Sequence, residues 1–279
     1  MFEIVHARQL SDSVFEMGVS APRIAAKVRA GQFLMVRTDE QGERIPLTFS
    51  DWSAEEGWIR FIYMRVGKTT HQLSHMGVGD FLADVVGPLG VPTHTSELGR
   101  VCVVGGGVGA AVAYPVARAM VAEGNEVHVV LGARNKQLLI LEDELRALPL
   151  ASLTVVTDDG SAGEKGLVTA PLKRFAESRA IDAAFAVGPA IMMKFCAATA
   201  AEHGVPITVS LNPIMVDGTG MCGACRVSVG NETRFGCVDG PDFDGHAVDW
   251  EELMSRQRIY NDAEREADAD YSRSCSCHL

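Results

Sequence analysis

Residues 100–124 read RVCVVGGGVGAAVAYPVARAMVAEG, and this stretch decides the fold class. An apolar run of β-branched residues leads into a glycine-rich turn, and a helical pattern of about fourteen residues follows. The next segments alternate between strand and helix patterns: EVHVVLGAR (126–134, strand), LLILEDELRAL (138–148, helix), SLTVVTDDG (152–160, strand), LVTAPLKRFAESR (167–179, helix), AAFAVGP (183–189, strand), IMMKFCAATAAEHG (191–204, helix) and PITVSLN (206–212, strand). This alternation predicts a parallel sheet with helices on both faces.

The residues before this stretch follow a different pattern. FLMVRT (33–38), GWIRFIYMRV (57–66) and DFLADVVGPLG (80–90) are short, rich in β-branched or aromatic residues, and separated by Gly and Pro. Such segments predict an antiparallel β-barrel. We therefore expect a barrel domain over 1–97, an α/β domain over 98–211, a cysteine-bearing module over 212–250 and an acidic helical tail over 251–279.

Composition excludes several classes of protein. The chain has 279 residues and a net charge of −11, which disfavours binding to nucleic acid. It contains no run of about 18 apolar residues, and its start, MFEIVHARQLSDSVFEM, lacks the features of a signal peptide. We therefore expect a cytoplasmic protein that is not bound to a membrane. The acidic stretch 238–270 predicts either a solvated, partly frayed helical tail or a docking surface for a basic partner.

Four turns of the α/β domain predict a nucleotide site. GGGVGA (105–110) joins a strand to a helix, where glycines let the backbone approach a phosphate near the helix N-terminus. Its spacing differs from the dinucleotide fingerprint G-x-G-x-x-G, so a tight structural turn is the alternative. LGARN (131–135), TDDGS (157–161) and AVGPAIMM (186–193) also follow strands, and ligands of such sheets bind at the carboxyl ends of strands. No basic cluster is present for a 2′-phosphate, which favours NAD over NADP, and Arg134 either pairs with a phosphate or is solvated.

Two segments of the barrel stand out. ERIPLTFSD (43–51) places an arginine beside an extended strand, and YMRVGKTTHQL (63–73) places Gly, Lys and two Thr at a helix start. An arginine facing a helix N-terminus suits a pyrophosphate. The alternative for Thr48, Thr69 and Thr70 is strand-end and N-cap chemistry.

The third motif is MVDGTGMCGACRVSVGNETRFGCVDG (215–240). It reads D-x4-C-x2-C-x11-C, which is the plant-type [2Fe–2S] spacing with a carboxylate in place of the first sulfur. The segment 226–238 alternates as a hairpin and returns the last cysteine to the loop. The spacing favours a [2Fe–2S] site over a zinc site, whose fourth ligand would come from Cys275, Cys277, His246 or His278, and over no metal at all. Cys102 and Cys196 lie in apolar runs and are expected to be core residues.

Taken together, RIPLTFSD, VGKTTHQL, GGGVG, LGARNKQLLILEDEL, TDDGS, VGP and DGTGMCGAC resemble the small subunits of NADH-dependent reduced ferredoxin:NADP oxidoreductases, also described as sulfide dehydrogenase subunits. These belong to the ferredoxin–NADP reductase superfamily, together with the electron-transfer subunit of dihydroorotate dehydrogenase type B. The resemblance covers residues 1 to about 260. Asp217 stands where the dihydroorotate relatives have Cys, so it favours the ferredoxin:NADP side of the family.

The resemblance implies three cofactors and their binding residues. It implies FAD in the barrel, bound by Arg44, Pro46, Leu47, Thr48, Met64, Val66, Gly67, Lys68, Thr69 and Thr70. It implies NAD(H) or NADP(H) at Gly105, Gly106, Gly107, Gly109, Gly132, Ala133, Arg134, Asp158, Gly188 and Pro189. It implies a [2Fe–2S] cluster held by Asp217, Cys222, Cys225 and Cys237.

A chain with these three sites is expected to convert between two-electron hydride transfer and one-electron transfer, with no side chain acting as an acid or base catalyst. The resemblance further implies a heterodimer with a large glutamate-synthase-like flavoprotein subunit that carries FAD and [4Fe–4S] clusters. Ferredoxin would react there by electron bifurcation. The alternatives are a stand-alone NAD(P)H:acceptor reductase and a non-catalytic nucleotide-binding subunit with structural zinc. Cys275 and Cys277 are either free thiols or additional ligands at a subunit contact.

Overall fold

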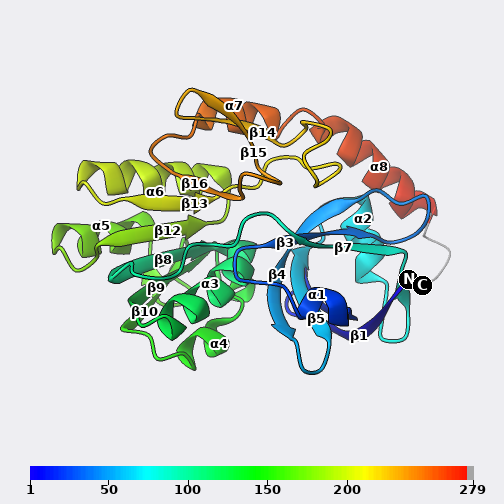
Figure 1. Ribbon diagram of the computed structural model, residues 1–279, viewed down its shortest axis with the longest axis horizontal. Helices are drawn as coiled ribbons and strands as arrows, with labels where there is room; N and C mark the ends of the chain where they lie inside the picture. Colours follow the sequence, from blue (N-terminus) through cyan, green and yellow to red (C-terminus); the bar gives the residue numbers. More distant parts are fainter. Residues whose placement is uncertain (275–279) are drawn as a thin grey trace.

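The computed structural model describes residues 1–274, in which an antiparallel sheet and a parallel sheet lie side by side and the C-terminal segment crosses both (Figure 1). Cys275, Cys277 and His278 therefore lie outside the described residues. Within residues 1–274, no helix is both long enough and apolar enough to cross a bilayer.

The N-terminal sheet has seven antiparallel strands in the order β6-β1-β2-β5-β4-β3-β7. Its two edge strands are consecutive in the chain and are separated only by Ala83, so the sheet curls back on itself as the predicted barrel. Its interior is filled by side chains such as Leu34, Phe49 and Phe61. The strands and helices of this part are β1 (Phe2–Gln9), β2 (Val14–Ser20), α1 (Pro22–Ala25), β3 (Phe33–Arg37), β4 (Ile45–Ser53), β5 (Trp58–Met64), α2 (Lys68–Ser74), β6 (Phe81–Leu82) and β7 (Asp84–Leu89).

The second sheet has the strand order β11-β10-β9-β8-β12-β13-β16, and every pair is parallel except β13 with β16. Strand order reverses beside β8, and in such sheets ligands bind at the carboxyl ends of the strands there. The elements are β8 (Arg100–Gly106), η1 (Gly107–Gly109), α3 (Ala110–Ala122), β9 (Glu126–Ala133), η2 (Lys136–Leu138), α4 (Glu142–Arg146), β10 (Ser152–Thr157), β11 (Glu164–Lys165), α5 (Thr169–Glu177), β12 (Ala183–Val187), α6 (Ala190–Glu202) and β13 (Ile207–Ser210).

Alternation along β8 explains why helices cover both faces of this sheet. Val101 and Val103 point to the face covered by α3, while Cys102 and Val104 point to the face covered by α5 and α6. Cys102 and Cys196 are fully buried in the second of these cores, as expected for small core residues.

The helix predicted over 138–148 is shorter than the sequence pattern indicated. Only α4 (Glu142–Arg146) is helical, because Leu141 has a left-handed backbone with φ of +60°. Ile140 and Leu141 are buried against the α3 face of the sheet. Tertiary packing of these apolar side chains therefore overrides the helical propensity of the residues around them.

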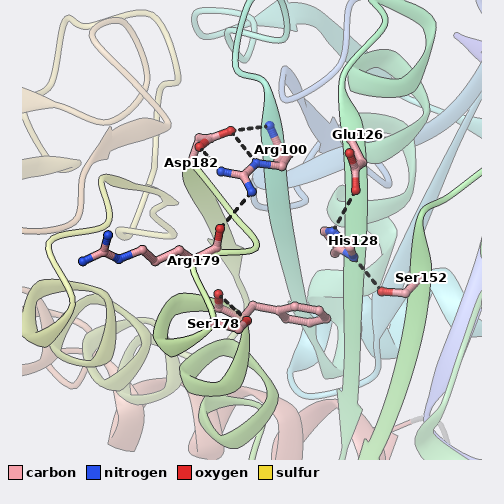
Figure 2. A network of polar contacts seen from close by, with 8 residues as sticks. Arg100, Glu126, His128, Ser152, Ser178, Arg179 and Asp182 are labelled. Atoms are coloured by element: carbon pink, nitrogen blue, oxygen red, sulfur yellow. Dashed lines mark hydrogen bonds and ion pairs between the residues drawn. The ribbon is translucent and has the colours of Figure 1, made fainter.

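Ion pairs and hydrogen bonds close the amino-terminal edge of the parallel sheet (Figure 2). Arg100, at the start of β8, donates to both carboxylate oxygens of Asp182, with N–O distances of 2.6 and 3.0 Å, and its Nη1 donates to the carbonyl of Arg179. These contacts lower the pKa of the Asp182 carboxyl to about 2. The polar network therefore joins the start of β8 to the residues just before β12. It lies at the edge opposite to the carboxyl ends of the strands, where ligands of such sheets bind.

The C-terminal segment runs back from the parallel sheet to the barrel (Figure 1). It comprises β14 (Arg226–Val229), β15 (Glu232–Phe235), β16 (Asp242–Asp244), α7 (Trp250–Arg256) and α8 (Asn261–Ser274). Helix α8 lies against α2 of the barrel, where Asp268 Oδ1 is 3.1 Å from His71 Nδ1 and the Tyr271 ring meets the His71 ring edge to face. The acidic tail is thus helical in the described residues and contacts the barrel.

The linker between the two sheets is tied to β16. Thr93 Oγ1 donates to Asp242 Oδ2 over 2.6 Å, and Val91 N donates to the carbonyl of Gly240 over 2.7 Å. The other carboxylate oxygen, Asp242 Oδ1, is buried and has no hydrogen-bond partner among the described residues. Burial raises the pKa of Asp242 to about 6, and the Thr93 hydrogen bond offsets only part of that rise.

Asp242→Asn is expected to stabilise the protein above pH 6. Between about pH 4 and pH 6 the folded chain binds more protons at Asp242 than the unfolded chain, so the free energy of unfolding falls as pH rises through that window. We expect Asp242→Asn to remove this loss, so that its free energy of unfolding exceeds that of wild type by about 3 kcal/mol at pH 7.5, with no difference near pH 4. Urea unfolding at both pH values measures this, with the exposed Asp244→Asn as control. An equal effect at both values would contradict the assignment.

Candidate functional site

The glycine turn after β8 is built for close packing. A Cβ at Gly109 would lie 2.4 Å from the carbonyl oxygen of Val187, and one at Gly105 would lie 2.8 Å from Ala113 Cβ. These glycines therefore let the end of β8, the start of α3 and the end of β12 meet. Gly107 differs, because it has φ of +56° and a Cβ there would face open space. A tight structural turn, the alternative raised from the sequence, therefore accounts for Gly105 and Gly109, while the backbone at Gly107 is accessible to a ligand.

The other three turns lie along the same edge. Strand register places Gly105 beside Val187 and Leu131, and Thr157 beside Ala133. A Cβ at Gly188 would lie 2.9 Å from the carbonyl oxygen of Gly106. The structure therefore gathers all ten candidate nucleotide residues at one end of the sheet: Gly105, Gly106, Gly107, Gly109, Gly132, Ala133, Arg134, Asp158, Gly188 and Pro189. Arg134 and Asp158 are exposed there.

The barrel residues fall into two groups. Pro46, Leu47 and Thr48 lie half-buried on β4, next to β3. Thr70 closes a turn at the start of α2, because its Oγ1 accepts from Val66 N and Gly67 N and donates to the carbonyl of Gly67. The N-cap interpretation therefore accounts for Thr70.

Two further side chains at the start of α2 are placed differently. Thr69 is buried, with its hydroxyl 3.5 Å from Glu43 Oε2. Lys68 is half-buried and makes no hydrogen bond or ion pair within residues 1–274, so its ammonium group is available to an anion.

Helix α3 connects the nucleotide edge to the barrel. Arg118 Nη1 lies 2.8 Å from Asp51 Oδ1 on β4, and its guanidinium lies 5.2 Å from the ring centroids of both Trp52 and Tyr114. Met64, a candidate site residue, packs into the same cluster of apolar residues. The helix that begins at the glycine turn is thereby fastened to the strand that carries the candidate FAD residues.

The hairpin of β14 and β15 brings two cysteines together. Cys225 and Cys237 flank it, and their sulfurs are 3.2 Å apart. Both thiols are buried against Phe33 and Met35 of β3, and burial raises the pKa of the Cys237 thiol. Two sulfurs bound to one tetrahedral metal at about 2.3 Å would be roughly 3.8 Å apart, so a small movement would let this pair bind one metal ion.

Asp217 and Cys222 lie on the outer side of the cysteine loop. The Asp217 carboxylate accepts from Thr219 N at 2.9 Å, Thr219 Oγ1 at 2.5 Å and Met221 N at 3.3 Å. These bonds, first the one from the Thr219 hydroxyl, lower the pKa of Asp217 and keep it an anion. Cys222 is exposed. Within residues 1–274 no three His, Cys, Asp or Glu side chains are grouped as metal ligands, so the structure joins two of the four predicted ligands.

The donor set nevertheless fits an iron–sulfur cluster. Two thiols are adjacent and a third is accessible, and the carboxylate is ionised. The loop turns through Gly218, Gly220 and Gly223 with φ of +82°, +87° and +67°, which glycine adopts without strain. His246, a ligand in the zinc alternative, has Nε2 3.0 Å from the carbonyl oxygen of Val205.

The cysteine loop and the candidate FAD strand are neighbours. Met35 pairs with Pro46 across the β3–β4 ladder, and a Cβ at Gly218 would lie 2.7 Å from Met35 Cγ. Arg44 extends from the start of β4, where its Nη2 lies 3.1 Å from Asp84 Oδ2, and its charge also helps to lower the pKa of Asp217.

Sequence reasoning missed the residues that join these sites. Met35 lies in an ordinary apolar strand and carries no sequence signal. Arg118 does carry one, because it is the only charged residue in an otherwise apolar helix, Ala110–Ala122, and such a residue needs a partner.

Comparison with known proteins identifies two domains in this chain. Residues 103–198 match the oxidoreductase NAD-binding domain, and residues 212–249 match the iron–sulfur cluster binding domain of dihydroorotate dehydrogenase B. The chain is 51% identical to a dihydroorotate dehydrogenase B (NAD⁺) electron transfer subunit homolog of Thermotoga maritima, covering 94% of this chain and 93% of that protein. It is 32% identical to the corresponding electron transfer subunit of Desulforamulus reducens, over 89% and 97%.

A solved structure is similar over nearly the whole chain. A chain in the structure of an NADH-dependent reduced ferredoxin–NADP oxidoreductase, a system of flavin-based electron bifurcation, aligns with a TM-score of 0.91 at 49% identity, covering 98% of this chain and 97% of that one. A ferredoxin reductase of a carbazole dioxygenase aligns with a TM-score of 0.61 at 19% identity, over 75% and 67%, which shows a shared fold.

Gly109→Ala is expected to destabilise the nucleotide edge. The new methyl group would meet the backbone of Val187 and Gly188, which cannot move without separating β12 from α3. We expect a loss of about 1–3 kcal/mol in the free energy of unfolding, the usual cost of overpacking. Gly77→Ala is the control, because a Cβ there meets nothing within 4 Å. Equal melting temperatures for the two variants in a thermal unfolding scan would contradict this account.

Proposed function

The chain belongs to the family of dihydroorotate dehydrogenase B electron transfer subunits, and from this premise we propose that it passes electrons between NAD(H), FAD and a [2Fe–2S] cluster as the small subunit of a ferredoxin:NAD(P) oxidoreductase complex. Such a subunit is an oxidoreductase component with an NAD-binding domain and an iron–sulfur domain. The non-catalytic alternative with a structural zinc is therefore set aside.

The cofactors supply the redox chemistry: a nicotinamide exchanges hydride, an iron–sulfur cluster exchanges single electrons, and a flavin does both. The protein binds and orients them. We assign the nicotinamide dinucleotide to the carboxyl edge of the parallel sheet, where the amide groups at the start of α3 favour phosphate. Arg134 is the only exposed cation among the candidate residues of that edge, so NAD(H) fits better than NADP(H).

We assign FAD to β4 and to the start of α2. The half-buried strand residues Pro46, Leu47 and Thr48 would contact the flavin, and the free ammonium group of Lys68 would meet the pyrophosphate. Arg118 holds α3 against β4 and so fixes the nucleotide edge relative to this strand.

We assign the cluster to Asp217, Cys222, Cys225 and Cys237. The buried Cys225 and Cys237 are close enough to bind one iron of the cluster. Asp217 and the exposed Cys222 would then bind the other iron. The Thr219 hydroxyl and amide hold the Asp217 carboxylate as an anion, which is the form that binds metal.

One observation carries the proposal: the buried cysteine pair packs on the strand next to the candidate FAD strand. Phe33 and Met35, which share one buried cluster with the two cysteines, pair with Thr48 and Pro46 across a single β ladder. The residues that would hold the flavin and those that would hold the cluster therefore lie on and against neighbouring strands.

The relatives of this chain are subunits, which supports a larger catalytic partner. We propose that the partner is a glutamate-synthase-like flavoprotein with FAD and [4Fe–4S] clusters, at which ferredoxin and NADP(H) react by electron bifurcation. The support for this partner is the 49% identity to the oxidoreductase chain, which extends over 98% of the present chain.

Low-temperature EPR and absorption spectroscopy of the anaerobically purified chain, before and after NADH, test the proposed route. We expect flavin bleaching together with the signal of a reduced [2Fe–2S] cluster. Dithionite serves as the control for a cluster whose potential lies too low for NADH. A preparation with neither flavin nor iron would refute the electron-transfer function.

Asp217→Cys is expected to keep the cluster and lower its reduction potential, because a thiolate donates more electron density to iron than a carboxylate does. A redox titration followed by EPR measures the shift. Thr219→Ser is a matched control, since it retains the hydroxyl that bonds Asp217. A titration of Asp217→Cys that overlays wild type would contradict the ligand assignment.

A further inference from the structure

The end of helix α7 touches the cysteine loop at two points. Arg256 Nη2 donates to the carbonyl of Ala224 over 3.0 Å, and Gln257 Nε2 donates to the carbonyl and to the side-chain oxygen of Asn212 over 3.0 and 2.9 Å. Asn212 and Ala224 enclose the stretch of chain that carries Asp217 and Cys222. Two consecutive side chains therefore hold both ends of the loop with the outer candidate ligands.

Helix α7 is itself firmly placed. The Asp249 side chain caps its N-terminus by accepting from Glu252 N at 2.9 Å, and Leu253 is 2% exposed in a core that it shares with α6. A capped helix with a buried side chain in its middle gives a fixed base for the residues at its end. Arg256 is half-buried, and its guanidinium bonds the neighbouring loop.

The bond from Arg256 fixes the orientation of the peptide that precedes Cys225. The N–H of a trans peptide points opposite to its C=O, so the bond from Arg256 to the Ala224 carbonyl turns the Cys225 N–H away from the guanidinium. Arg226 Nη1 donates to the carbonyl of Gly223 over 3.3 Å. Of the three peptides between Cys222 and Cys225, the two that follow Gly223 and Ala224 are thus oriented by arginine side chains.

These two arginines also line a pocket beside Cys222. The chain carries −11 overall, yet a pocket of about 310 Å³ beside Cys222 is lined by Arg226 and Arg256 and by no acidic residue. Adding an electron to a nearby metal centre makes that centre more negative. A fixed guanidinium next to it favours the reduced form, and partial burial weakens the screening by water.

We infer that Arg256 is a positioning residue for the cysteine loop and that its charge raises the reduction potential of the [2Fe–2S] cluster, an inference that rests on the proposed function. Arg256 lies outside the iron–sulfur domain match, which ends at residue 249. The positive charge is therefore supplied by the neighbouring helix α7. Gln257 completes it at the other end of the loop.

Three variants of the full chain test this inference. Arg256→Gln removes the charge, Arg256→Lys keeps it, and Arg258→Gln is the matched control. Arg258 lies two residues further along, is exposed, and its side chain makes no hydrogen bond or ion pair within residues 1–274. The readouts are the midpoint potential by EPR-monitored titration and amide hydrogen exchange of residues 217–224 in the metal-free chain.

We expect Arg256→Gln to shift the reduction equilibrium about tenfold toward the oxidised cluster, which is about 59 mV for a one-electron couple. Arg256→Lys should keep the potential near that of wild type, and Arg258→Gln should shift it far less. In the metal-free chain, exchange of residues 217–224 should be faster in Arg256→Gln than in Arg258→Gln. A folded Arg256→Gln variant that fails to retain iron would support the positioning role.

The inference is overturned if Arg256→Gln matches Arg258→Gln in both potential and loop exchange. Failure of the proposed function is a separate outcome: wild type would then hold no [2Fe–2S] cluster. In that case the exchange measurement on the metal-free chain still decides whether Arg256 orders the loop.

Discussion

The contact on which the candidate site depends most is the packing of the Cys225 and Cys237 thiols against Phe33 and Met35 of the barrel. It forces the chain to return from the parallel sheet to the sheet where it began. Burial among apolar side chains favours the neutral form of each thiol. The two sulfurs lie 3.2 Å apart. The loop that carries Asp217 and Cys222 then has to lie outside this pair, beside the start of β4.

The parallel sheet divides its two edges between stability and binding. At the amino edge, Arg100 donates to the carboxylate of Asp182 and to the backbone carbonyl of Arg179, so these polar groups are satisfied within the protein (Figure 2). At the carboxyl edge, glycines bring strand ends and α3 together and leave backbone groups for a ligand. This division agrees with the general location of ligands in such sheets. It also explains why the titratable cluster at the amino edge has no part in the proposed electron route.

The C-terminal helices act on the site from outside it. Helix α7 holds the cysteine loop through Arg256 and Gln257, and α8 lies on α2 of the barrel through Asp268 and His71. The acidic stretch that suggested a tail or a docking surface therefore also contacts the cysteine loop and the barrel. The same stretch supplies Arg256, one of the two arginines beside Cys222.

Local patterns in the sequence determined most of the elements and the three binding motifs. Alternation of strands and helices predicted the parallel sheet, and the D-x4-C-x2-C-x11-C spacing identified the candidate ligands, because both signals depend on residues near one another in the chain. The helix over 138–148 was overestimated, since the burial of Ile140 and Leu141 depends on distant partners. The partners of Met35, Arg118 and Arg256 were decided by the tertiary structure alone. Each acts on a residue far away in sequence, and no local periodicity records which segments the folded chain brings into contact.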